Sequence, residues 1–253
     1  MTAPGGTTLV WLALAGAAGI LLGPVLRARI FRHSVPVEHR VRQACPGCGR
    51  ALVPDGWRGL AAVLPPTGRC PGCRRRIGPA AAAVEAVAAV TFGTLVLVGD
   101  TALEAAAFWW VAGGGVALAF IDLAVHRLPD RLTLTGYAGA LLLLGAAAVA
   151  GGRLDTFGLA VLYGLGMALC YLLLVLVHPA GMGLGDVKLA LALGLVLGWF
   201  GGAATVLGAA AGFLLAGGYA AVLLVMRRAG RKDAIAHGPF MLAGALAVIV
   251  LVG

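Results

Sequence analysis

The chain has 253 residues, of which 61% are hydrophobic and only 11% are charged. Its mean hydropathy is +0.99, which excludes a water-soluble globular domain of this length. The formal net charge of +9 comes from cations that are concentrated in particular loops, and this pattern is a signal of membrane topology. The charge therefore gives no reason to expect nucleic-acid binding. Composition therefore predicts an all-α polytopic membrane protein whose solvent is the lipid bilayer.

Apolar segments near the roughly 20 residues that a helix needs to cross a bilayer recur along the whole chain. The sixth of them, which starts just after Asp186, is the shortest. We expect about eight transmembrane helices, at residues 7–26, 80–99, 104–125, 132–151, 155–177, 187–200, 203–226 and 238–252.

Lysine and arginine are confined almost entirely to alternate loops. Of the 19 cations, all except Arg153 lie in residues 27–79, 126–131, 178–188 and 227–233. Cytoplasmic loops of membrane proteins carry an excess of Lys and Arg, so these four loops are predicted to be cytoplasmic and both termini to be outside. The first apolar segment has arginines after it and none before it, the reverse of a signal peptide, so we expect it to remain as an anchor.

The spacing of these segments predicts three regions. Residues 1–26 form the first transmembrane helix, 27–79 a small cytoplasmic domain, and 80–253 a membrane domain of seven helices. The cations of residues 27–33 are expected to anchor the chain at the lipid head groups.

Two Cys-Pro-Gly-Cys sequences lie in the cytoplasmic region. Their order, C-x2-C-x21-C-x2-C, lets two turns point four thiolates at one tetrahedral metal ion, which makes a structural zinc site the favoured interpretation. Two disulfides are the alternative, and they are disfavoured in a reducing cytoplasm. The predicted ligands are Cys45, Cys48, Cys70 and Cys73, whereas Cys170 lies within a span and is expected only to pack.

Two carboxylates are predicted at the cytoplasmic ends of membrane helices. Asp122 ends an inward-going helix, and Asp186 begins an outward-going one after a turn that contains Gly183 and Gly185. Both acids therefore sit at the same depth and can face each other. Two carboxylates that share a site cannot both ionise, so one holds a proton while the other acts as a base, with Asp186 the better anion at its helix N-terminus. The alternative for Asp186 is a simple helix N-cap.

Three further charged residues have open interpretations. Glu85 lies just inside the second span, where it can have a functional role or pair with a nearby arginine such as Arg74, Arg75 or Arg76. Lys188 can hold Asp186 charged, bind an acidic group on a substrate, or anchor at the interface. Asp130 follows Pro129 and is most simply the N-cap of the next helix.

Four motifs taken together resemble the bacterial type IV prepilin leader peptidases, which are membrane aspartic proteases of the G-x-G-D class. These motifs are the paired C-x2-C knuckles, I-D-L-x-x-x-x-L-P-D around Asp122, G-x-G-D-x-K at residues 183–188, and His237-Gly-Pro-Phe at 237–240. Their order and spacing cover essentially the whole chain.

The resemblance implies a function for the matching residues. Asp122 and Asp186 would be the catalytic pair, and the enzyme would remove the short basic leader from type IV prepilins or pseudopilins at the cytoplasmic face of the bacterial inner membrane. Larger members of the family also N-methylate the new terminus, with S-adenosylmethionine as the cofactor.

The chain departs from the family pattern at several positions. The second acid of the D-x-D sequence is replaced by Ala124, and the R-Y-P-L-V-E pattern is reduced to four alanines, Val84 and Glu85, with its proline displaced to Pro79. The first-span motif is degenerate at residues 19–23, and His237 replaces a phenylalanine. The changes at residues 19–23 and 79–85 lie in the half of the chain that the family associates with methyl transfer.

Two other classes of protein stay open. One is a different G-x-G-D intramembrane protease, which would share only the two acids with this chain. The other is a transporter that carries protons or cations on paired intramembrane acids, although the chain lacks clear internal repeats.

Overall fold

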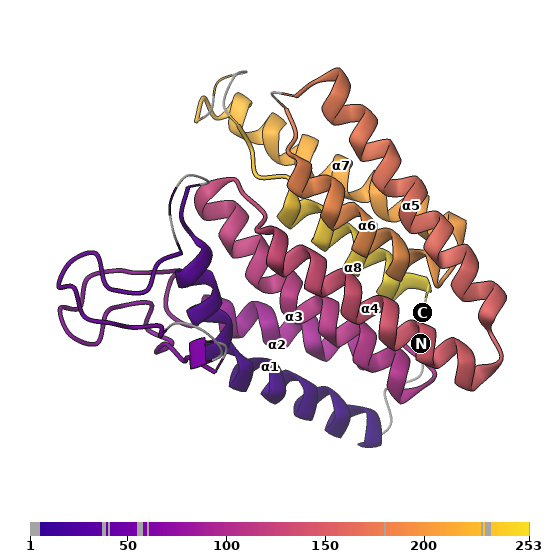
Figure 1. The fold of residues 1–253 in the computed structure, drawn as a ribbon, viewed down its shortest axis with the longest axis horizontal. Helices are drawn as coiled ribbons and strands as arrows, with labels where there is room; N and C mark the ends of the chain where they lie inside the picture. Colours follow the sequence, from indigo (N-terminus) through magenta and orange to yellow (C-terminus); the bar gives the residue numbers. More distant parts are fainter. Residues whose placement is uncertain are drawn as a thin grey trace. The chain divides into compact units, whose positions relative to one another are not determined.

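The computed structural model describes residues 6–36, 39, 41–54, 58–59, 61–179, 181–228, 230 and 234–252. Within these residues the chain forms eight α-helices and two isolated β-bridges, which confirms the all-α prediction (Figure 1). Three of the predicted cytoplasmic cations, Arg40, Arg231 and Lys232, lie outside the described residues. The chain divides into two compact units, Met1–Leu97 and Val98–Gly253.

The first unit is built on the close approach of α1 (Gly6–His33) and α2 (Ala83–Leu95). A Cβ atom at Gly19 would lie 2.6 Å from the backbone of Ala88, and one at Gly23 would lie 2.5 Å from the Cγ atom of Glu85. Small residues four positions apart let two helix backbones pack closely, which is how helices associate where lipid removes the hydrophobic driving force.

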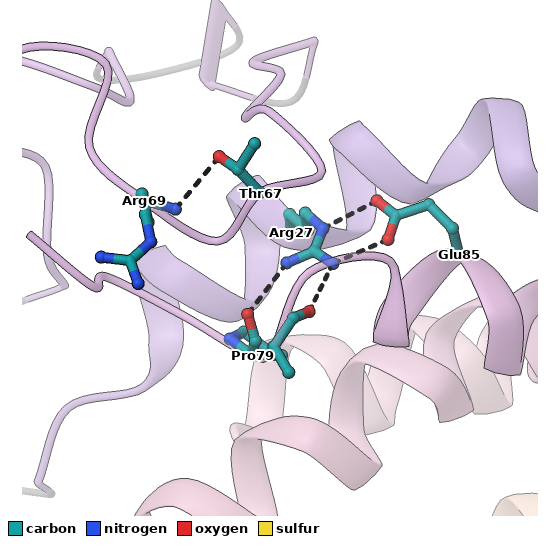
Figure 2. A network of polar contacts seen from close by, with 6 residues as sticks. Arg27, Thr67, Arg69, Pro79 and Glu85 are labelled. Atoms are coloured by element: carbon teal, nitrogen blue, oxygen red, sulfur yellow. Dashed lines mark hydrogen bonds and ion pairs between the residues drawn. The ribbon is translucent and has the colours of Figure 1, made fainter. Parts of the chain in front are cut away.

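A buried ion pair joins the two helices of this unit (Figure 2). Nε and Nη2 of Arg27 donate to the two carboxylate oxygens of Glu85, each at 2.7 Å. The same guanidinium donates to the carbonyls of Pro79 at 3.2 Å and Ala80 at 2.9 Å. Arg27 is only 2% exposed, so the prediction that it anchors at lipid head groups was wrong. Glu85 pairs with this helical arginine instead of one from the predicted set at 74–76.

The second unit is a bundle of six helices in which α6 is the most buried (Figure 1). Every residue of α6 from Leu189 to Gly198 except Leu191 is buried. It packs against α4, α5, α7 and α8, whereas α3 packs against α4 and α8. The bounds are α3 Ala102–Val125, α4 Asp130–Gly151, α5 Leu154–Val177, α6 Leu184–Gly198, α7 Gly202–Val225 and α8 Gly238–Val252.

Glycines bring α5 against α6 in the second unit. A Cβ atom at Gly194 would lie 2.8 Å from Cα of Gly164, and one at Gly198 would lie 2.9 Å from Cα of Ala160. Because α6 has almost no bulk on this face, it can occupy the centre of the bundle.

Close backbone packing at glycines also joins α7 to α8. A Cβ atom at Gly244 of α8 would lie 2.5 Å from the backbone nitrogen of Gly212 and 3.0 Å from the carbonyl oxygen of Gly208. These two α7 glycines are four positions apart, as in the other close helix pairs.

Five of the eight helices are long and apolar enough to cross a membrane, which makes this a multi-pass membrane protein. They are α1, α3, α4, α5 and α7. The other three were also predicted as spans, but α2 has 13 residues and α6 and α8 have 15 each. At 1.5 Å per residue a 15-residue helix is roughly 22 Å long, less than the roughly 30 Å of bilayer hydrocarbon.

Arg153, the one cation predicted outside the cytoplasmic loops, is held within the second unit. Its Nη1 atom lies 3.2 Å from Oε1 of Glu104, and its guanidinium lies 4.7 Å from the ring centroid of Trp199. Glu104 is 3% exposed and belongs to the first turn of α3, after the N-cap Thr101. The ion pair therefore ties the loop between α4 and α5 to the start of α3.

We predict that Glu85→Gln destabilises the protein by about 3 kcal/mol, because it leaves the buried Arg27 guanidinium without a counter-charge. Thermal unfolding of the purified protein in detergent measures the effect. Arg76→Gln is the control, since Arg76 is exposed and its Nε donates to the Gly78 carbonyl. Equal midpoints for the two variants would show that the buried pair does not stabilise the fold.

Candidate active site

Asp122 lies near the end of α3 and is only 5% exposed. Its Oδ2 atom accepts a hydrogen bond of 3.0 Å from the backbone N–H of Gly238, the first residue of α8. The first N–H groups of a helix have no partner within that helix and carry its positive dipole end. The carboxylate is thus stabilised by the N-terminus of α8, which offsets the unfavourable dipole at the end of its own helix.

Asp186 is the third residue of α6 and is 8% exposed. The N-cap of this helix is Gly183, and Oδ2 of Asp186 accepts the N–H of Gly183 at 2.9 Å. Asp186 was predicted at the start of the helix, and it lies in the first turn. The alternative that it serves as the N-cap was wrong, because the N-cap is Gly183. Its carboxylate reaches back from the first turn to the N-cap backbone, as the acid of a capping box does.

Leu128, in the loop after α3, lies against the start of α6, which carries Asp186, and against Gly238, which donates to Asp122. A Cβ atom at Gly185 would lie 2.8 Å from Cβ of Leu128, and one at Gly238 would lie 3.4 Å from its Cδ2. Leu128 is 6% exposed, so it is enclosed by these neighbours. The L-P-D, G-x-G-D and H-G-P-F motifs therefore meet around one leucine.

The two acids lie within electrostatic range of each other. Each carboxylate has one hydrogen bond from a backbone N–H at the start of a helix. Such donors cannot give up a proton, so any proton held by the pair must reside on the carboxylates or on a bound water. Mutual repulsion of this kind opposes ionisation of both carboxylates at once.

Lys188 and Asp130 bind each other, an arrangement that the sequence did not indicate. Nζ of Lys188 lies 2.6 Å from Oδ1 of Asp130. Helix α4 starts at Asp130 with Pro129 as its N-cap and has no side-chain cap bond, so the predicted N-cap role of Asp130 was wrong. The pair connects the second turn of α6 to the first turn of α4, next to the segment that carries Asp186.

The backbone donor on Asp122 was the functional group that sequence reasoning missed. The H-G-P-F sequence at 237–240 stood out as a motif, but nothing in it identified which group would face an acid. The donor is the backbone nitrogen of Gly238, where a Cβ atom would lie 2.9 Å from Oδ2 of Asp122. The remaining predicted site residue, Glu85, belongs to the first unit and is bonded to Arg27.

The four predicted metal ligands come together in the first unit. Their sulfur atoms all lie within 4.8 Å of one another, with 3.6 Å between Sγ of Cys45 and Cys73 and 3.8 Å between Sγ of Cys48 and Cys70. These distances are far too long for disulfides. They match the edge of roughly 3.8 Å that a tetrahedron has when its metal–sulfur bonds are about 2.3 Å. The four cysteines can therefore bind one metal ion.

The two cysteine knuckles have the same local geometry. The N–H of Gly47 donates to Sγ of Cys45 and that of Gly72 donates to Sγ of Cys70, both at 3.4 Å. The hydrogen bond from Gly47 lowers the pKa of Cys45 to about 6, so its thiolate, the form that binds metal, is favoured. Cys45 and Cys70 belong to a small hydrophobic core that includes Phe31, Val53, Leu64 and Ile77.

The chain is similar to known proteins of one family. Residues 106–220 match the model of the type IV leader peptidase family. The chain is 34% identical over 225 residues to a prepilin leader peptidase/N-methyltransferase of Burkholderia pseudomallei (strain 1026b), covering 85% of this chain and 70% of that protein. It is 35% identical to the protein of the same name from Aeromonas salmonicida (strain A449), covering 62% and 54% of the two chains. No solved structure gives a significant match.

We expect the purified protein to carry one metal ion per chain and Cys45→Ser to lose it, because three thiolates no longer complete the tetrahedral set. Elemental analysis after gel filtration measures the ratio. Cys170→Ser is the matched control, since Cys170 lies on α5 outside this cluster. Undiminished metal in the Cys45→Ser protein would contradict the site.

The two glycines of the G-x-G-D motif should respond differently to alanine. Gly185→Ala places a methyl group against Leu128 and should cost about 1–3 kcal/mol of stability. A Cβ atom at Gly183 would lie 3.8 Å from both Oδ2 of Asp186 and the backbone nitrogen of Gly185, which are ordinary contacts, so Gly183→Ala should unfold close to the wild-type midpoint. Thermal unfolding in detergent distinguishes them, and equal effects would refute the described contact.

Proposed function

Because the chain belongs to the type IV leader peptidase family, we propose that it removes the leader from type IV prepilins or pseudopilins by aspartic catalysis. The relatives carry the name prepilin leader peptidase, and Asp122 and Asp186 are the proposed catalytic pair. One observation supports this pairing above all others: two buried carboxylates lie in electrostatic range, each fixed by the N-terminus of a different helix.

The proposed reaction needs only water and the two acids. Asp186, as the carboxylate, takes a proton from a water molecule whose oxygen attacks the scissile carbonyl carbon, while Asp122 donates its proton to the carbonyl oxygen. The resulting tetrahedral diol collapses when the leaving nitrogen receives the proton held by Asp186 and Asp122 takes one back from a diol hydroxyl. The C–N bond breaks, one water is consumed, and the pair returns to its starting protonation.

The polypeptide positions both acids through backbone N–H groups. Gly183 and Gly238 orient one oxygen of each carboxylate, which leaves the other oxygens for water and substrate. Leu128 fixes the spacing between the segments that carry the two donors, and the Lys188–Asp130 pair holds the start of α6 against α4. Pre-set geometry of this kind lowers the barrier because no group has to be ordered during the reaction.

The charge pattern supports a cytoplasmic location for the cleavage. With the cationic loops inside and both termini outside, the ends of α3 and the start of α6 would face the cytoplasm in the bacterial inner membrane. A basic leader stays on that side while the apolar helix of a prepilin enters the bilayer. The scissile bond would then lie at the depth of Asp122 and Asp186.

We propose zinc as the metal of the four-cysteine site and a structural role for it. Four thiolates fill a tetrahedral zinc ion and leave no position for water. The core that surrounds the knuckles is small, so the ion would supply much of the stability of this region. When bound, zinc would cross-link residues 45–48 to residues 70–73.

N-methylation of the new N-terminus is a separate proposal that rests on the relatives, which are named prepilin leader peptidase/N-methyltransferase. Glu85, the acid retained in the half of the chain that the family associates with this activity, gives both oxygens to Arg27. It is therefore not free to bind S-adenosylmethionine, and no methyl-transfer step follows from the structure. Mass spectrometry of a processed prepilin would separate leader loss from methylation.

Asp122→Asn and Asp186→Asn should each reduce the rate of prepilin cleavage at least roughly 100-fold, because an amide can neither accept the proton from water nor return it. Initial rates with a purified prepilin in native membranes measure the loss. Asp155→Asn is the control, since Asp155 is an exposed acid in the first turn of α5. Near-normal cleavage by both variants would end the protease proposal and favour a proton or cation pathway.

A further inference from the structure

Gly68 places the second cysteine knuckle next to the buried Arg27–Glu85 pair. A Cβ atom at Gly68 would overlap the carbonyl oxygen of Pro79 and would lie 3.4 Å from Nη1 of Arg27. The same Nη1 atom donates to the Pro79 carbonyl at 3.2 Å (Figure 2). Gly68 is buried, and its φ of 65° is a conformation that favours glycine. The start of the segment that carries Cys70 therefore lies against the guanidinium.

The second knuckle is the tip of a short hairpin that begins at Gly68. The N–H of Ile77 donates to the carbonyl of Gly68 at 3.0 Å, and the N–H of Cys70 donates to that of Arg75 at 2.9 Å. These bonds join the two arms of the hairpin on either side of residue 69. A displacement of Gly68 would therefore move Cys70, which lies only two residues further along the same arm.

Arg27 holds both ends of this hairpin. Gly68 lies next to Nη1 at the start, and at the end the carbonyls of Pro79 and Ala80 accept from Nη1 at 3.2 Å and Nη2 at 2.9 Å. Both carbonyls precede α2, so these bonds are made to the hairpin and not to the helix. Glu85 fixes the plane of the guanidinium through its bonds to Nε and Nη2. The ion pair therefore orients the base of the second knuckle.

The first knuckle is attached to α1 at a different point. The N–H of Arg42 donates to the carbonyl of Arg32, in the last turn of α1, at 2.8 Å. Ala28 and Phe31 of the same helix belong to the hydrophobic core that contains cysteines of both knuckles. Apolar contacts of this kind are not directional. The hydrogen bonds of Arg32 and of Arg27 therefore set how the two knuckles face each other.

The closest sulfur pairs of the metal site each span both knuckles. Sγ of Cys45 lies 3.6 Å from Sγ of Cys73, and Sγ of Cys48 lies 3.8 Å from Sγ of Cys70. A tetrahedral ion can bind all four thiolates only while the knuckles keep this relative position. Metal affinity should therefore depend on the contacts at the base of each knuckle, including those of Arg27.

We propose that Arg27 is a positioning residue for the four-cysteine metal site. Oriented by Glu85, its guanidinium holds the second knuckle where it can share a metal ion with the first, so the ion pair and the bound metal stabilise each other. The inference rests on the proposed metal site and does not depend on peptide cleavage. Because coupling between two sites is reciprocal, metal that binds more tightly when the pair is intact must also strengthen the pair. Metal at the four cysteines would thereby stabilise the contact of α1 with α2.

The zinc affinity of Glu85→Gln and Arg27→Lys tests this inference. Glutamine removes the carboxylate that orients Arg27, whereas lysine keeps a cation for Glu85 but lacks the fixed fork that binds two carboxylate oxygens and two carbonyls together. We expect the zinc dissociation constant to rise about tenfold in both, the size of effect that loss of a contact behind a metal ligand has. Competition between the full-length protein in detergent and a colorimetric zinc chelator measures it.

Glu104→Gln and Arg153→Lys are the matched controls, since they alter the Glu104–Arg153 pair of the second unit in the same way. Both controls should bind zinc as tightly as wild type. Wild-type zinc affinity in Arg27→Lys would overturn the inference. An equal loss in Arg27→Lys and Arg153→Lys would also overturn it, because that result indicates general destabilisation. Arg27→Lys decides the matter if Glu85→Gln does not fold.

Thermal unfolding with and without metal tests the reverse direction of the coupling. Glu85→Gln should lower the unfolding midpoint of the zinc-loaded protein more than that of protein stripped with EDTA, because stripping already releases the second knuckle from the first. Equal lowering in both states would contradict the coupling. If the wild-type protein binds no zinc, the metal site and the inference fail together, whereas equally tight zinc binding by wild type and all variants refutes the role of Arg27 alone.

Discussion

The proposed active site depends on two hydrogen bonds from helix N-termini to buried carboxylates. The start of α8 binds Asp122 through Gly238, and the start of α6 binds Asp186 through Gly183. A carboxylate buried in a membrane domain is costly unless donors or counter-charges accompany it. Backbone donors meet this need without neutralising the acids permanently, as an arginine would. Glu85 illustrates the contrast, because its bidentate pair with Arg27 leaves it no oxygen for chemistry.

Small residues allow the close helix packing on which this arrangement depends. Glycines at 194 and 198 let α6 approach α5, and glycines at 208 and 212 let α7 approach α8. The centre of the second unit can therefore hold a short helix whose first turn carries an acid. In lipid, where apolar side chains gain little by leaving their surroundings, such close backbone packing is a principal source of helix association. Leu128 then couples the loop after α3 to the starts of α6 and α8.

Sequence reasoning predicted the features that depend on local pattern. The lengths of the apolar segments predicted eight helices, and the C-x2-C spacing predicted that four thiols come together. The positions of Asp122 and Asp186 at helix ends predicted that the two acids lie in one region. It failed where the partner comes from a distant segment. Arg27 is 58 positions from Glu85, and Gly238 is 116 positions from Asp122. The donor at Gly238 is also a backbone group, which every residue except proline has, so no residue type could have revealed it.

The most direct test of the account is whether residues 122 and 186 adjoin each other in the membrane. Asp122→Cys combined with Asp186→Cys, in a Cys170→Ser background, can be treated in native membranes with a short bifunctional thiol reagent and mapped by peptide mass spectrometry. The account predicts a link between positions 122 and 186, and none in the control pair Asp122→Cys with Asp155→Cys. Separate labelling of positions 122 and 186, with no more linkage than the control pair gives, would contradict the shared site.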